Sequence, residues 1–191
     1  MQSKTLNIRQ FLKYKLLNSA FLGMSVGSIF ILYAPLMPSV YSIGGIALAF
    51  GMLLLAKIYS KILNIEAFFK ISLFVELTLL FLILYFLLFS YSYMTALIFY
   101  IGYQVTFTFG SYLIRAETLF LKKAKALEFV DVAKQKGYLF GMFLSYLFYE
   151  TSEQFFNVAE KQTQVYNIHF LLLASELFII YFLLKSFRKR P

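Results

Sequence analysis

Two glutamates stand inside long apolar stretches of the sequence. Glu76 lies within residues 71–89 and Glu176 within residues 169–184, and both stretches consist mainly of large apolar residues. A charge is costly inside a membrane, so an ionisable residue there is a candidate for proton uptake and release. Burial disfavours the charged form of a carboxyl, and either glutamate is therefore a candidate for coupling proton movement to a conformational change.

The sequences around the two glutamates, Phe-Val-Glu-Leu and Ala-Ser-Glu-Leu, correspond if the chain consists of two inverted three-helix repeats. The alternative to proton coupling is a structural role. Each carboxyl would then accept a hydrogen bond or form an ion pair near the membrane interface, with Lys70 or another base as the partner of Glu76.

A stripe of polar residues runs through residues 94–114 and ends just beyond them. Its members are Tyr100, Gln104, Thr108, Ser111 and Arg115. Their spacings of 4, 4, 3 and 4 residues place them on one side of an α-helix. A buried amide or hydroxyl group needs a partner or water. The stripe is therefore either the wall of a cavity that contacts a substrate or a set of hydrogen bonds between helices.

The sequence contains few candidate residues for metal binding or enzyme catalysis. The chain has no cysteine, and its single histidine, His169, has no neighbouring carboxylate, so no metal site and no cofactor are predicted. Asp131 is the one aspartate, and neither a Gly-x-Ser-x-Gly nor a His-Glu-x-x-His motif occurs. The sequence does not predict an enzyme.

The composition indicates which elements must position these residues. Of the 191 residues, 61% are hydrophobic and 14% charged, which excludes a soluble enzyme, a nucleic-acid-binding domain and a disulfide-rich secreted domain. Segments in lipid must be helical. We expect an all-α polytopic membrane protein, one domain over residues 1–191 with six transmembrane helices. The six segments are 16–34, 40–56, 71–89, 94–114, 137–149 and 169–184.

The basic residues are distributed unevenly among the connections. All of them except Lys161 fall in the N-terminal segment 1–15, the second connection, the loop 115–136 or the tail 185–191. The positive-inside rule places these regions in the cytoplasm and residues 150–167 outside, as expected for a multi-pass protein of a bacterial inner membrane. Lipid attracts these bases, so nucleic acid is not a predicted partner. The loop 115–136 has a helical composition, and we expect it to lie at the membrane surface or to extend the fifth helix inward. It is either a gating linker or partner dock, or a solvated loop attracted to the leaflet surface.

Glycines predict which helices pack closely. All nine lie in or at the ends of the first, second, fourth and fifth segments. Two series repeat every fourth residue, namely Ser19, Gly23 and Gly27 in the first segment and Gly137, Gly141 and Ser145 in the fifth. Small residues let helices approach in lipid. We therefore expect helices one, two, four and five inside the bundle, and helices three and six at its periphery.

This arrangement resembles one six-helix half of a major facilitator superfamily transporter. The second connection keeps a glycine and two spaced bases of the family's Gly-x-x-x-Asp-Arg-x-Gly-Arg-Arg signature, at Gly51, Lys57 and Lys61. Ala56 and Tyr59 replace its aspartate and second glycine. In that family helices one and four line the cavity, two and five form the interface between halves, and three and six are peripheral.

The resemblance implies a half-unit that moves a small solute by alternating access, with or without proton coupling. Its path would be lined by Tyr100, Gln104, Thr108 and Ser111. The other half would be a second copy, with Gly137, Gly141 and Ser145 at the seam, or a separate six-helix chain. The alternatives are a truncated product, a non-transporting subunit that binds a partner protein, and the substrate-binding subunit of an ATPase-powered importer.

Overall fold

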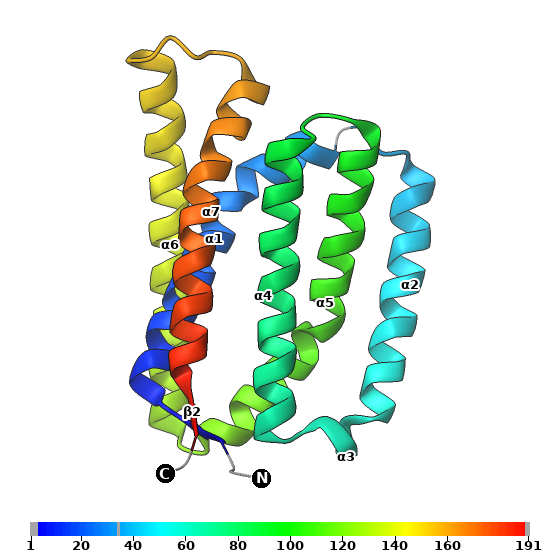
Figure 1. The fold of residues 1–191 in the computed structure, drawn as a ribbon, viewed down its shortest axis with the longest axis vertical. Coiled ribbons are helices and arrows are strands. Elements are labelled where there is room, and N and C mark those ends of the chain that lie inside the picture. Colours follow the sequence, from blue (N-terminus) through cyan, green and yellow to red (C-terminus); the bar gives the residue numbers. More distant parts are fainter. Residues whose placement is uncertain (1–3, 34, 190–191) are drawn as a thin grey trace.

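The computed structural model describes residues 4–33 and 35–189, and most of them are helical (Figure 1). The helices are α1 (Ile8–Tyr33), α2 (Pro38–Lys57), α3 (Tyr59–Ile62), α4 (Ile65–Leu88), α5 (Tyr93–Leu121), α6 (Ala124–Gln154) and α7 (Lys161–Ser186). Two short strands, β1 (Lys4–Leu6) and β2 (Phe187–Lys189), lie at the ends of the chain. The predicted all-α class is confirmed at this level.

Five of these helices are long and apolar enough to cross a membrane, which indicates a membrane protein. Among the described residues these are α1, α2, α4, α5 and α7. Helix α6 has 31 residues, but its first half carries several charges, among them Lys125, Glu128 and Lys134. The six predicted spans are therefore matched by six long helices, of which five meet the length and composition of a membrane span.

The segment 115–136, predicted as a cytoplasmic loop, is almost entirely helical. Helix α5 continues to Leu121 and α6 begins at Ala124, so Lys122 and Lys123 form the whole connection. Lys122 adopts a left-handed conformation, with φ 56°, that ends α5 sharply. The helical composition predicted for this segment is confirmed, whereas the predicted ends of the fourth and fifth segments at 114 and 137 were wrong. Charged residues were taken as the ends of these helices, but they continue the helices beyond their apolar parts.

The first and last described segments of the chain meet at one end of the molecule. Strands β1 and β2 pair antiparallel, with Thr5 opposite Arg188, and the backbone N–H of Asn7 donates to the carbonyl of Ser186 at 2.7 Å. Helix α3 and the α5–α6 connection lie at this same end, while the α6–α7 connection lies at the other (Figure 1). The fold thus gathers the segments rich in Lys and Arg at one end.

Helices α4 and α7 have a buried face each, which corrects the prediction that the third and sixth segments are peripheral. In α4 this face includes Glu76, Leu82 and Phe86, and in α7 it includes Glu176 and Ile179. Both faces pack on each other, and α1 packs on α7. Large apolar side chains can pack between helices or face lipid. Their presence alone therefore does not distinguish an interior helix from a peripheral one.

Helix α2, predicted to lie inside the bundle, is the most exposed of the long helices. Only Leu55 is buried in it, and α2 packs mainly against α5. In Figure 1 it stands at the edge of the bundle, beside α5. Two of its three glycines face this one contact. Gly44 lies under the ring of Tyr100, and a Cβ at Gly51 would stand 3.1 Å from the Cγ2 of Thr108.

The two series of small residues pack against each other within the chain. Helices α1 and α6 approach so closely that a Cβ at Gly23 would meet the backbone of Tyr138, and one at Gly141 the backbone of Ala20. The hydroxyl of Ser145 donates to the carbonyl of Met24 at 3.3 Å. Because α1 covers this face, it is not a seam between two copies, and that part of the homodimer prediction was wrong.

Replacing Gly141 by Ala is expected to lower the free energy of unfolding by about 1–3 kcal/mol, because the new methyl group meets backbone atoms that cannot rotate away. Gly45→Ala is the matched control, since a Cβ there meets nothing within 4 Å. The control should leave stability unchanged or raise it by up to about 1 kcal/mol. Thermal unfolding in detergent compares the two, and equal stability would contradict the close packing of α1 on α6.

Candidate functional site

The two glutamates of the apolar stretches lie side by side in the structure, both buried. Glu76 of α4 and Glu176 of α7 are 1% and 0% exposed, and their carboxyl groups are close enough to act on each other electrostatically. Each stands ten or eleven residues from the helix end nearest the termini, about 15 Å along the axis. The sequence singled out both residues, and the packing of α4 on α7 brings them together.

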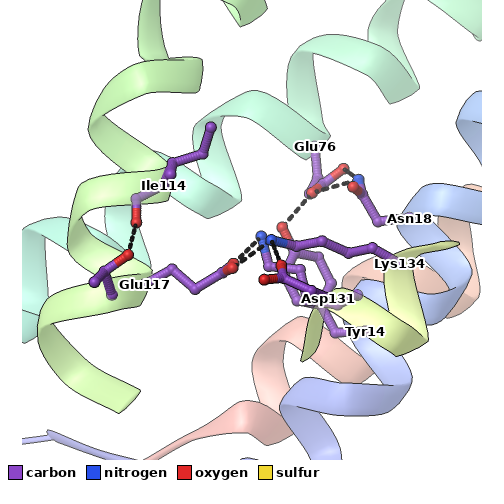
Figure 2. Close-up of polar contacts among 9 residues, drawn as sticks. Tyr14, Asn18, Glu76, Ile114, Glu117, Asp131 and Lys134 are labelled. Carbon is purple, nitrogen blue, oxygen red and sulfur yellow. Dashed lines mark hydrogen bonds and ion pairs between the residues drawn. The ribbon is translucent and has the colours of Figure 1, made fainter. Parts of the chain in front are cut away.

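Two side chains of α1 hold the carboxyl of Glu76. The Tyr14 hydroxyl donates to its Oε1 at 2.6 Å, and the Asn18 amide donates to both oxygens at 3.1 and 3.3 Å (Figure 2). Tyr14 and Asn18 are one turn apart, so both face α4 from the same side of α1. These three donated bonds fix the orientation of Glu76.

Glu176 has no comparable donor. Neither of its carboxyl oxygens has a hydrogen-bond donor among the described residues. Two ionised carboxylates offer only acceptors and repel each other, whereas one proton turns one of them into a donor to the other. The pair Glu76–Glu176, which we call the acid pair, is therefore an arrangement that can hold one proton between two carboxyls.

A cluster of ion pairs extends from the acid pair to the surface. The Nζ of Lys15 lies 2.7 Å from the Oε2 of Glu117, and Lys134 pairs with the other oxygen of Glu117. Lys134 also reaches Asp131 at 3.3 Å (Figure 2). The side chain of Glu117 is 4% exposed and that of Asp131 69%. We call Lys15, Glu117, Lys134 and Asp131 the ion-pair cluster.

Lys15 connects the cluster to the acid pair. It follows Tyr14 on α1, and its charge acts on Glu76 as well as on Glu117. The sequence analysis proposed Lys70 or another base as the partner of Glu76, and the base close to it is Lys15 rather than Lys70. Lys70 is exposed, and six residues of helix turn it about 120° around α4 from Glu76.

His169 is buried between α7 and the aromatic side chains of α4 and α5. Its Nδ1 stands 2.6 Å from the carbonyl of Val165 and therefore carries the proton of that hydrogen bond, while the ring packs 4.0 Å from that of Phe86. No group of three potential metal ligands occurs among the described residues. His169, Ser25 and Tyr103 line an internal cavity of about 10 Å³, enough for one water molecule.

The polar stripe of α5 faces α2 and is separate from the acid pair. Tyr100, Gln104 and Thr108 line a groove of about 480 Å³ between these helices. Ser111 lies beyond the groove, where its hydroxyl is 3.2 Å from that of Tyr59, and the guanidinium of Arg115 stands over the Tyr59 ring at 5.8 Å. One part of the stripe thus lines a groove and another connects α5 to α3, and contact with a substrate stays a prediction.

The residues that resemble the transporter signature form no ion pair. Gly51 contacts Thr108, while Lys57 ends α2 and Lys61 lies in α3, and both lysines are exposed. Neither base pairs with a carboxylate in the part of the chain that the structure describes. The ion pairs at this end are those of the ion-pair cluster instead.

The sequence analysis missed the residues that surround Glu76 and Glu117. Tyr14 and Lys15 were assigned to the N-terminal segment, Asn18 to the first span without a role, and Glu117 and Lys134 to a loop. A signal was present, because Tyr14 and Asn18 are spaced as neighbours on a helix.

No protein-family model, no curated protein and no solved structure matches the chain.

Proposed function

We propose that this chain is a proton-coupled, transporter-like unit that moves a small solute across a bacterial inner membrane by alternating access. The observation that carries the proposal is the acid pair, two carboxyls buried on facing helices at the centre of a bundle. Ionisable residues inside membrane proteins commonly form proton relays. The ion-pair cluster supports this function because it leads from the pair to an exposed carboxylate.

Lys15 provides the coupling in this proposal. While the acid pair holds a proton, Lys15 binds Glu117 and ties α1 to α5. Loss of the proton leaves a second negative charge near Lys15, which then competes with Glu117 for the ammonium group. Movement of Lys15 toward Glu76 weakens the contact between α1 and α5, so proton release loosens the end of the bundle where the termini lie.

The proposed orientation places the termini in the cytoplasm and counts α6 as a sixth span. The argument is the positive-inside rule applied to the end that carries β1, β2, α3 and the α5–α6 connection. On this view the ion-pair cluster faces the cytoplasm. The glutamates near the α6–α7 connection face the outside.

Cysteine labelling tests this orientation, since the chain has no native cysteine. In intact cells Phe156→Cys, in the α6–α7 connection, should react with a membrane-impermeant maleimide. Lys123→Cys, in the α5–α6 connection, should react only after the cells are opened. Labelling of both variants in intact cells, or of Lys123→Cys alone, would overturn the proposed topology.

A second half completes the transporter in this proposal, either as a second copy or as another six-helix chain resembling half of a major facilitator superfamily transporter. Helix α2 supports this idea, because it buries only Leu55 within the chain and leaves its other faces free for a partner. The same observation favours the second candidate function, a non-transporting subunit that binds a partner protein.

Transport by purified protein in liposomes separates these functions. Liposomes with an imposed pH gradient and a pH-sensitive dye inside are screened with solutes in turn. A transporter should give proton movement that depends on one solute class and on the protein. Solute-independent signals throughout the screen, together with recovery of a stoichiometric partner from native membranes, would favour the partner-binding subunit.

A further inference from the structure

The groove between α2 and α5 has the size of a binding site and apolar walls. Its volume of about 480 Å³ lies within the range of roughly 300–1,000 Å³ that small-molecule sites occupy. The apolar walls are formed by Ile43, Ala47, Leu48, Leu97, Ile101 and Val105. A molecule that fills this groove is therefore apolar over most of its surface.

Two close contacts between α2 and α5 flank the groove. The Tyr100 side chain lies over Gly44, and the Thr108 side chain lies against Gly51. Gln104 stands one turn from each of them, between the two contacts. The space around Gln104 is thus bounded by fixed contacts of α2 on α5.

Gln104 carries the unmatched polar group of this groove. The Tyr100 hydroxyl donates to the carbonyl of Tyr41 at 3.0 Å, and the Thr108 hydroxyl donates to the carbonyl of Gln104 at 2.8 Å. The side-chain Oε1 of Gln104 is buried and has no hydrogen-bond partner among the described residues. A buried amide oxygen without a hydrogen-bond partner is costly at membrane depth. A ligand that supplies a hydrogen-bond partner for Gln104 therefore gains the most binding free energy at this position.

We infer that the groove binds a membrane-dissolved molecule with a long apolar body and a single hydroxyl group, and that the hydroxyl lies at Gln104. A hydroxyl both donates and accepts, so it fits either orientation of the carboxamide. Sugars and ions bring several polar groups that these walls leave unmatched. This assignment rests on the proposed function, because it identifies the bound molecule with the solute that the protein transports.

Photolabelling in liposomes tests the inference without requiring transport. Two probes with the same diazirine-bearing C16 chain are compared, one a primary alcohol and the other the corresponding alkane. Labelled peptides are identified by mass spectrometry. The alcohol should label the groove residues of α2 and α5 about tenfold more than the alkane, which is the effect of one additional hydrogen bond.

Variants assign this preference to Gln104. Gln104→Leu should label equally with both probes, whereas Gln135→Leu, an exposed position on α6, should keep the wild-type ratio. Ala47→Phe fills the groove and should remove labelling by both probes. Each variant is compared only if it melts at the wild-type temperature.

Equal labelling of the wild type by alcohol and alkane would overturn the inference, because the groove would then hold any acyl chain. Absence of labelling at the groove would overturn it as well. Alcohol-selective labelling at Gln104 without solute-dependent proton movement would leave the site standing and contradict the proposed function. The two failures are therefore distinguishable.

Discussion

Glu176→Gln will abolish solute-dependent proton movement while leaving the protein at least as stable as the wild type. The Gln amide donates a hydrogen bond to Glu76, as a protonated Glu176 would, but it cannot release a proton. It also removes the repulsion between two buried carboxylates. Loss of function without loss of stability is the signature expected of a proton-binding residue.

Glu76→Gln will also abolish proton movement but at a cost in stability of about 1 kcal/mol. Its amide nitrogen would face the donor amide of Asn18, which in the wild type binds both carboxyl oxygens. Glu128→Gln, an exposed position on α6, is the control and should transport normally. The dye assay in liposomes and thermal unfolding measure the two properties. Wild-type proton movement in either acid-pair variant would contradict the proposed role.

Glu117→Gln will give the largest loss of stability among single changes in the ion-pair cluster. The change leaves the ammonium groups of Lys15 and Lys134 without their shared carboxylate, and Lys15 is 11% exposed. Breaking a buried ion pair by removing one partner costs about 3–5 kcal/mol. We expect the lower end of this range, because Lys134 is 25% exposed and reaches solvent.

The control within the same cluster is Asp131→Asn. Asp131 is 69% exposed, and an exposed ion pair contributes about 0–1 kcal/mol. Chemical unfolding followed by circular dichroism compares the two variants. Similar losses for Glu117→Gln and Asp131→Asn would show that Glu117 is not buried in an ion pair. The double variant Lys15→Met/Glu117→Leu should be more stable than Glu117→Leu alone, because it removes the charge of Lys15 together with that of Glu117.

Hydropathy predicted the centres of the long helices and failed at their ends. The first segment was expected to begin at residue 16, but α1 begins at Ile8 and carries Lys13, Tyr14 and Lys15 within its first turns. Charged residues lower the hydropathy of a window, yet a helix continues through them when its other face packs. Tyr14, which donates to Glu76, lies in this unpredicted part of α1.

The sequence predicted the members of the acid pair but not their contact. Glu76 and Glu176 stood out because each is a single acidic residue in an apolar run. Their meeting depends on α4 packing against α7, and helices rich in Leu and Phe contain no signal for choosing a neighbour. Small residues contain such a signal, and the two glycine series are indeed brought together in α1 and α6.

Infrared difference spectroscopy tests the central claim, that the acid pair holds and releases a proton, most directly. A pH jump across the range in which the protein moves protons is applied to the protein in lipid. The carbonyl stretch of protonated carboxylic acids is then recorded. We predict a band in the wild type that is absent from Glu176→Gln and from Glu76→Gln and unchanged in Glu128→Gln. A band that persists in both acid-pair variants, or no band in the wild type, would contradict the account.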